Sequence, residues 1–222
     1  MLANDANSLI WWDWIGRHRG LIVERTVEHL QLTAIAVGIG LALTLILAAL
    51  AQRWRFLRGP LTWISTWLYT IPSLAVFGFL IPISGASLLT AEIALVAYSL
   101  FILLGNLLDG LDAVPLSVRD AADGLGFRPT QRFVRVDLPM ALPSLLTGIR
   151  LATVSTIALV TITFQVGYGG FGALIDQGMK RDYFSTEILL GGFLALAAAL
   201  VADRVLAVAG RFLTPWTRRG AR

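Results

Sequence analysis

Long stretches without a charged residue constrain this chain more than any other feature of its sequence. Residues 30–52 and 59–91 contain no Asp, Glu, Lys or Arg. A helix needs roughly 20 apolar residues to cross the hydrocarbon core of a bilayer, and both stretches reach that length. The hydrophobic content of 56% and the mean hydropathy of +0.73 extend the pattern to the whole chain. The sequence therefore predicts an all-α integral membrane protein.

Turn residues divide the apolar stretches into five predicted transmembrane helices. Pro82, Gly85 and Ser87 mark a turn inside the second uncharged stretch, so a span is expected on each side of it. The other spans are separated by charged links. The predicted spans are residues 30–52, 61–81, 88–108, 145–166 and 188–209.

The positions of arginine predict the orientation in the membrane. Arg accounts for all but one of the 18 Lys and Arg residues. It gathers in the link at residues 53–58, in the long link at residues 109–143 and after the last span, which five spans place on one side. Because cytoplasmic loops carry an excess of Lys and Arg, this side is predicted to be cytoplasmic. The chain is expected to be a multi-pass protein of the cell membrane, with its N-terminus outside and its C-terminus inside.

One membrane domain with two short terminal segments is predicted. Residues 1–29 form an extracytoplasmic segment, residues 30–212 the transmembrane domain, and residues 213–222 a cytoplasmic basic tail. Trp11, Trp12 and Trp14 favour a segment that lies in the outer membrane interface, since indole prefers that level. A disordered apolar tail is the alternative for this segment.

The link at residues 109–143 is long for a connection between adjacent spans, and such length usually serves a function. Pro115 can start a helix, and Gly126 followed by Pro129 can end it. A second short helix is expected at residues 130–136, stopping before Leu138. The pattern predicts a small helical elbow, residues 115–139, that contacts a cytosolic partner; a solvated loop is the alternative.

The elbow resembles the EAA loop of ABC transporter permeases. The family pattern is Glu-Ala-Ala, three residues, Gly, nine residues and Ile-x-Leu-Pro. This chain matches it, with Asp in place of Glu and Val in place of Ile, at Asp120, Ala121, Ala122, Gly126, Val136, Leu138 and Pro139. The resemblance implies that these residues couple the permease to a cytoplasmic ATPase. It also implies a type I ABC importer permease fold, with ATP and Mg²⁺ bound by the ATPase and no cofactor bound by this chain.

Other parts of the chain are similar to permeases of the osmoprotectant subfamily, which import glycine betaine, choline or carnitine. The similar segments are residues 26–33, 69–78, 143–153 and 167–172. The resemblance implies a quaternary ammonium cargo and a second permease subunit, in a homodimer or a heterodimer. A separate extracytoplasmic substrate-binding protein is expected, since no such domain follows the last predicted span.

The second predicted span contains candidates for the translocation pathway. Pro72 and Pro82 interrupt it, and a freed backbone carbonyl is tolerated in a membrane mainly where it meets neighbours or a cavity. Tyr69, Pro72 and Ser73 are therefore expected to border the pathway. Tyr69 could also offer an aromatic face to a quaternary ammonium group.

Three further polar side chains lie in or near predicted spans, at Tyr98, Asn106 and Gln165. Hydrogen bonding between helices is favoured over substrate contact for all three. Tyr98 is retained as a second aromatic candidate for the pathway.

Gly167, Gly169, Gly170 and Gly172 fit the GxGxxG pattern of dinucleotide-binding proteins. That interpretation is rejected because a membrane span precedes the pattern, whereas the dinucleotide motif follows a strand. Two alternatives are open for these glycines: an outer loop or gate near the docked binding protein, or close helix packing by small residues.

Several functional classes are excluded or disfavoured. The sequence contains no Walker A, GxSxG or HExxH motif, so no enzymatic activity is predicted. With no Cys and two His, a metal centre is not expected. The net charge of +4 and pI near 10.1 do not indicate nucleic-acid binding, because the arginines flank membrane spans.

The charged residues near the ends of the predicted spans do not favour an ion-coupled transport mechanism. An ion-coupled secondary transporter would require carboxylates inside the membrane and inverted repeats, and neither is visible. Asp109 and Asp112 are interpreted as a solvated pair at the interface, in preference to a proton or metal site. Arg150, Asp203 and Arg204 are expected to reach lipid headgroups. An ABC permease for another small solute is the nearer alternative.

Overall fold

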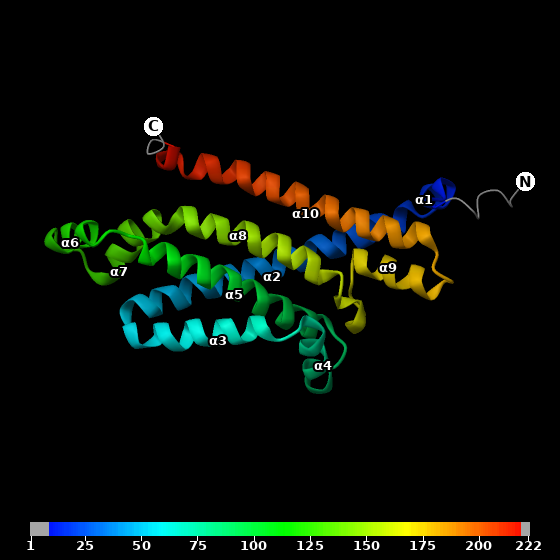
Figure 1. Cartoon of the computed structure of the whole chain (residues 1–222), viewed down its shortest axis with the longest axis horizontal. Helices are drawn as coiled ribbons and strands as arrows, with labels where there is room; N and C mark the ends of the chain where they lie inside the picture. Colours follow the sequence, from blue (N-terminus) through cyan, green and yellow to red (C-terminus); the bar gives the residue numbers. More distant parts are fainter. Residues whose placement is uncertain (1–8, 219–222) are drawn as a thin grey trace, which may run out of the picture.

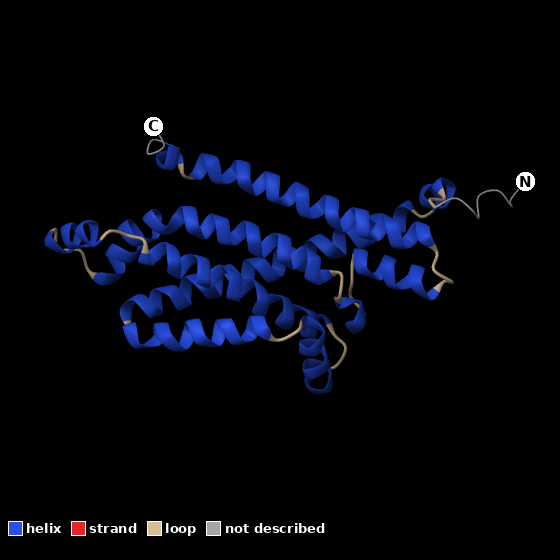
Figure 2. Cartoon of the chain, viewed as in Figure 1, coloured by secondary structure: helices blue, strands red, loops and turns tan. Residues whose placement is uncertain are grey.

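The computed structural model describes residues 9–218, and this part of the chain is helical with short connections and no strand (Figures 1 and 2). Its elements are α1 Trp12–Arg17, α2 Arg19–Arg53, η1 Arg55–Leu57, α3 Arg58–Thr70, α4 Ser73–Ser84, α5 Leu88–Asp112, α6 Leu116–Gly124, α7 Pro129–Arg132, η2 Phe133–Asp137, α8 Leu138–Val160, η3 Thr163–Val166, α9 Phe171–Lys180, α10 Ser185–Leu213 and η4 Pro215–Arg218.

Within the described residues, four helices are long and apolar enough to cross a membrane. They are Arg19–Arg53, Leu88–Asp112, Pro129–Val160 and Ser185–Leu213. They correspond to four of the five predicted spans and confirm the predicted all-α membrane fold. The long helices lie roughly along one direction in Figure 1.

The second predicted span, residues 61–81, is interrupted at Pro72, as the sequence indicated. The helix breaks between α3 and α4, and α4 turns away from α3 at a steep angle (Figure 1). Ile71 at the break is extended, with φ −73° and ψ 124°. The reason is steric, because the ring of Pro72 disfavours a helical conformation at the residue before it. Pro82, in contrast, lies inside α4.

Helix α5 forms the centre of the bundle and packs against α2, α3 and α8. Its buried leucines recur at helical spacing and meet small residues of α2 and the start of α8. The cluster contains Ala48, Ala51, Leu104, Leu107, Leu108, Leu111, Ala141 and Leu145. Glycines allow close approach: a Cβ at Gly110 would lie 2.6 Å from that of Ser144, and one at Gly40 only 2.3 Å from Ser99 Oγ. Small residues at such contacts are typical of helix packing in membranes.

Helix α10 is different, because most of its apolar side chains are exposed. It packs on α8 and α9, while Phe193, Leu196, Val205 and Phe212 face outward. An exposed apolar surface of this length is typical of a helix that faces lipid or another membrane subunit.

The predicted grouping of arginine-rich regions agrees with the fold. The link at residues 53–58, the elbow and the end of α10 all lie toward the left end of the bundle in Figure 1. Helices α1 and α9 lie toward the opposite end. The three arginine-rich regions thus lie at one end of the bundle. Five predicted spans require this arrangement when α3 and α4 together are counted as the second span.

The tryptophans near the N-terminus pack on the beginning of α10. The ring of Trp14 is buried and meets Phe184 edge-on at 5.5 Å between centroids. The backbone N–H of Trp11 donates to Thr186 Oγ1 at 2.9 Å. The alternative of a disordered tail is therefore wrong for residues 11–14, and the Trp12 side chain is left exposed.

Candidate coupling site and translocation pathway

The first helix of the elbow, α6, ends in a Schellman motif at Gly126. The N–H of Phe127 donates to the carbonyl of Ala122 at 3.2 Å, and the N–H of Gly126 donates to that of Asp123 at 2.9 Å. Gly126 has φ of +78°, a conformation that favours glycine. The prediction that the chain turns at this glycine is confirmed.

The second part of the elbow does not stop before Leu138, as the sequence suggested. Instead α7 passes through one wide turn, η2, and continues into α8. The N–H of Leu138 donates to the carbonyl of Phe133, five residues earlier. Pro139 has no N–H to donate, so the change of hydrogen-bond pattern just before it lets the helix continue through the proline. The elbow is therefore joined directly to a membrane-spanning helix.

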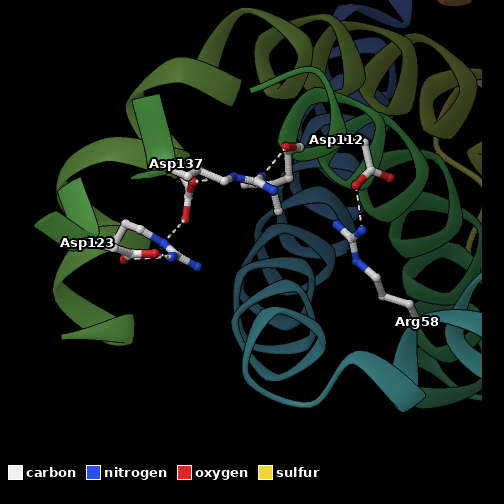
Figure 3. A network of polar contacts seen from close by, with 7 residues as sticks. Arg58, Asp112, Asp123 and Asp137 are labelled. Carbon is white, nitrogen blue, oxygen red and sulfur yellow. Dashed lines mark hydrogen bonds and ion pairs between the residues drawn. The ribbon is translucent and has the colours of Figure 1, made fainter. Parts of the chain in front are cut away.

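A buried carboxylate, Asp137, lies where the elbow meets the membrane helices (Figure 3). Only 1% of its side chain is exposed. Arg119 Nε donates to its Oδ1 at 3.0 Å, and Arg132 Nε lies 3.4 Å from its Oδ2. A carboxylate this deeply buried requires such partners, because an unpaired charge would be costly.

The two arginines extend this network to other elements. Arg119 also donates to the carbonyl of Leu111 in the last turn of α5. Arg132 also donates to Asp123 of α6 at 2.7 Å. Helix α6 is thus attached directly to the end of α5 and, through Asp137, to η2, which continues into α8.

A separate ion pair lies at the same end of the bundle. Arg58 Nη1 donates to Asp112 Oδ1 at 2.5 Å and joins the start of α3 to the end of α5 (Figure 3). Asp109 and Asp112 are both exposed, which agrees with the interpretation as solvated carboxylates, and Asp112 in addition pairs with Arg58. Asp109 lies one turn earlier and has no ion pair within residues 9–218.

The structure divides the predicted coupling residues by exposure. Asp120 and Ala121 are exposed on α6, Ala122 is buried with 5% exposure, and Gly126 is exposed at the turn. Leu138 is half-buried and Pro139 exposed at the start of α8.

Exposed leucines continue the outer surface of the elbow. Leu116 and Leu125 are 72% and 77% exposed. The outer surface of α6 thus combines apolar side chains with the carboxylate of Asp120. Ala122 belongs to the interior of the elbow, where its methyl group packs within the chain.

Sequence reasoning missed Asp137, Arg119 and Arg132. A signal was present, because Asp137 is a lone carboxylate at the entry to an apolar span, and such a group requires a basic partner. Spacing did not show which arginines supply it, since Arg119 is 18 residues away.

The predicted pathway residues gather around the break between α3 and α4. The Tyr98 hydroxyl donates to the carbonyl of Ile71, so it forms the interhelical hydrogen bond that was favoured for it. Pro72 is exposed and Ser73 half-buried beside this bond. The Tyr69 side chain lies outside the described part of the chain. Asn106, in contrast, donates within its own helix, to the carbonyl of Ile102.

The glycine turn, residues 167–172, packs against the outer part of α2. The N–H of Gly169 donates to Glu28 Oε1 at 3.1 Å, and that of Phe171 donates to His29 Nδ1 at 3.3 Å. The ring of His29 stacks on that of Phe171 at 4.3 Å. A Cβ at Gly170 would lie 2.5 Å from that of His29.

Two further features define this turn. Gly167 has φ of +85° and Gly170 of +47°, and a Cβ at Gly172 would lie 1.9 Å from the Thr161 carbonyl oxygen. The contacts are those of the close-packing alternative. Glu28 and His29 were not identified from the sequence, because their partners are more than 140 residues away.

Arg150 was expected to reach lipid headgroups, but it pairs with another helix instead. Its Nε and Nη2 donate to Asp203 Oδ1 at 2.9 and 2.7 Å, which joins α8 to α10. Pairing between two membrane helices satisfies both charges. Within residues 9–218 there is no group of three or more side chains that could hold a metal ion.

Comparison with known proteins identifies the family. Residues 34–219 match the family described as binding-protein-dependent transport system inner membrane component. The chain belongs to this family. It is a permease component of an ABC importer, a class in which the partner ATPase hydrolyses ATP.

Curated relatives match over most of the chain. The osmoprotectant import permease protein OsmW of Salmonella typhimurium is 35% identical over 202 residues, 88% of this chain and 93% of the relative. The choline transport system permease protein OpuBB of Bacillus subtilis is 33% identical over 197 residues, 88% and 90% of the two chains. The glycine betaine/carnitine/choline transport system permease protein OpuCB of Bacillus subtilis is 30% identical, with the same coverage.

A solved structure supports the fold independently. A chain of the inward-facing MetNI methionine ABC transporter superposes with a TM-score of 0.78 at 19% identity, covering 89% of this chain and 98% of that chain. At this identity the comparison concerns the fold, and it agrees with the predicted permease architecture.

Proposed function

We propose that this permease imports a quaternary ammonium osmoprotectant such as glycine betaine, choline or carnitine. The observation that carries the proposal is the set of relatives, which are named for these substrates and match nearly 90% of the chain at 30–35% identity.

Competition uptake tests the substrate class. Vesicles that contain the permease, its ATPase and its binding protein should take up labelled glycine betaine, choline or carnitine in an ATP-dependent manner. Unlabelled members of this group should compete. Competition only by an amino acid, a sulfonate or an inorganic anion would refute the substrate class, while ion-driven uptake without ATP would contradict the transport mechanism.

The elbow is the proposed contact for the ATPase, through the exposed surface around Asp120, Ala121, Leu116 and Leu125. Apolar side chains exposed at a cytoplasmic end are expected to be covered by a partner. The ATP and Mg²⁺ would be held by that partner. The attachment of α6 to α5 and α8 through Asp137 provides a route by which ATPase movement reaches the bundle.

Two adjacent alanines make a matched test of this contact. Ala121→Arg adds volume on the exposed surface and should abolish copurification of the ATPase while leaving the permease folded. Ala122→Arg forces a charge into the interior of the elbow and should lower the thermal stability as well. Normal ATPase copurification with Ala121→Arg would contradict the proposed contact.

The proposed orientation has the N-terminus outside and the elbow in the cytoplasm. Because the chain has no Cys, single cysteines at Ser84 and Arg128 can be labelled specifically. The Ser84→Cys variant should react with an impermeant maleimide from outside and Arg128→Cys only after permeabilisation. Labelling of both from the same face would refute this topology.

The external binding protein is proposed to contact this chain near the glycine turn. The second permease subunit is proposed to contact it along the translocation pathway. Tyr69, Pro72, Ser73 and Tyr98 are the proposed pathway border. Gly167, Gly169 and Gly170 give the turn a fixed shape that a docked binding protein can press against.

A further inference from the structure

An aromatic cavity lies between α3 and α5. Its volume is about 840 Å³, within the range of small-molecule sites. The lining includes Arg58, Trp63, Trp67, Phe101, Asp109 and Asp112. It therefore brings a cation, three aromatic rings and two carboxylates to one place, and one of the carboxylates, Asp112, is paired with the cation.

The aromatic part of this cavity suits a quaternary ammonium group. The rings of Trp63 and Trp67 are 5.3 Å apart and inclined at 51°, so they present two faces to the same space. Indole is the strongest aromatic partner of a cation that lies within about 6 Å of its ring. The Asp109 carboxylate, which has no ion pair within the described residues, adds negative charge at the other wall.

The polar part suits a carboxylate. Arg58 uses Nη1 for Asp112, but its Nε and Nη2 are buried and have no hydrogen-bond partner within the described part of the chain. Buried donors without partners are costly, and a planar guanidinium can donate in parallel to a carboxylate. Arg58 is one of the residues that line the same cavity as the tryptophans.

We propose that this cavity is a transit site for the cargo, in which Trp63 and Trp67 contact the quaternary ammonium group and Arg58 receives the carboxylate of a zwitterionic cargo. The site rests on the proposed substrate class and adds the residues that recognise it. Trp63 and Trp67 are 63% and 57% exposed, so the cavity is open and binding is weak, as release into the cytoplasm requires.

A unique cysteine can report occupancy of the cavity. Gly105 lines it, and a Cβ at this position meets nothing within 4 Å. In nanodiscs with the ATPase, choline and glycine betaine should slow labelling of Gly105→Cys by a methanethiosulfonate reagent. The neutral analogue 3,3-dimethylbutan-1-ol, which replaces the ammonium nitrogen by carbon, should not. Gly16→Cys, on the exposed surface of α1 at the opposite end of the bundle and equally free of clashes, is the control that should show no protection.

Two variants in the Gly105→Cys background assign the roles. Trp63→Leu, which keeps apolar volume without the indole ring, should raise the choline concentration for half-protection about fivefold. Arg58→Gln should weaken protection by glycine betaine about fivefold more than protection by choline, which has no carboxylate. Trp216→Leu changes an exposed tryptophan outside the cavity and should leave protection unchanged.

The results separate this site from the proposed function. Absence of protection, or equal protection by the neutral analogue, overturns the transit site whatever the uptake assay shows. Protection in a complex that imports none of the three osmoprotectants supports the site and refutes the proposed cargo. If Arg58→Gln weakens protection by glycine betaine and by choline equally, the assignment of the cargo carboxylate to Arg58 is overturned.

Discussion

The two ends of the bundle hold their non-membrane segments by different means. Helix α6 of the elbow is attached by Arg119 to the end of α5 and to the buried Asp137 of η2, which continues into α8, and the apolar outer surface of the elbow is left exposed. The glycine turn at the other end is packed closely, because a Cβ at Gly170 would overlap His29 of α2 and a Cβ at Gly172 would overlap the backbone of Thr161. Side-chain ion pairs tolerate small rotations, whereas contacts with backbone do not. The comparison indicates an elbow suited to passing on movement and a turn suited to staying in place.

The largest loss of stability is expected from a substitution that introduces a steric overlap in the glycine turn. Gly172→Ala places a Cβ 1.9 Å from the Thr161 carbonyl oxygen, and backbone must move to relieve the overlap. Overpacking of this kind costs about 3 kcal/mol or more. We expect a large loss of folded permease in size-exclusion profiles and a lower thermal midpoint. Gly38→Ala, where a Cβ meets nothing within 4 Å, is the matched control and should behave as the parent.

A smaller but still substantial loss of stability is expected from Asp137→Asn in the elbow. Removing the buried charge leaves Arg119 and Arg132 without their shared partner. The cost should be about 2–3 kcal/mol, below that of a fully buried pair because both guanidinium groups are partly exposed. Limited proteolysis should cut the elbow of this variant first. Asp120→Asn, on the exposed surface, should leave stability unchanged; equal losses in both variants would contradict the role of the network.

A substitution at the turn of the elbow should lower the stability less, and its structural effect should be confined to the elbow. Gly126→Val places a β-branched residue at φ of +78°, at a cost on the order of 1–2 kcal/mol. The membrane helices should stay folded while ATPase copurification and uptake fall. Gly124→Ala, inside α6, is the control and should retain both activities. Normal uptake by Gly126→Val would show that the Schellman turn does not matter for coupling.

The smallest effect is expected between the two ends, at the pair that joins α8 to α10. The side chains of Arg150 and Asp203 are 38% and 32% exposed, so their interaction is screened. We expect a coupling of less than about 1 kcal/mol from a double-mutant cycle of Arg150→Gln and Asp203→Asn. A coupling several times larger would show that the middle of the bundle depends on charge as much as the elbow does.

The sequence predicted the elbow better than it predicted the glycine turn. Helix α6 and the positive φ of Gly126 follow from neighbouring residues, since a Schellman motif is completed within one turn. The contacts of the glycine turn with Glu28 and His29 join residues more than 140 positions apart. No local pattern specifies such partners.

Local rules placed one proline correctly and misplaced another. Pro72 interrupts its span, as predicted, and separates α3 from α4. Leu138 and Pro139 were expected to follow a helix end, but a wide turn carries the helix through them. Proline indicates where a helical hydrogen bond is lost, and the surrounding packing decides whether the helix bends, widens or ends.

The sequence by itself determined the membrane class, the end of the bundle that carries arginine, and the coupling motif. These depend on hydropathy, on charge and on short spacings, which are properties of single residues and their near neighbours. The tertiary structure alone decided that Ala122 faces inward, that Asp137 is paired with both Arg119 and Arg132, and that Arg58 and two tryptophans line one cavity. These depend on which helix surfaces meet, and packing between helices joins residues that the chain keeps far apart.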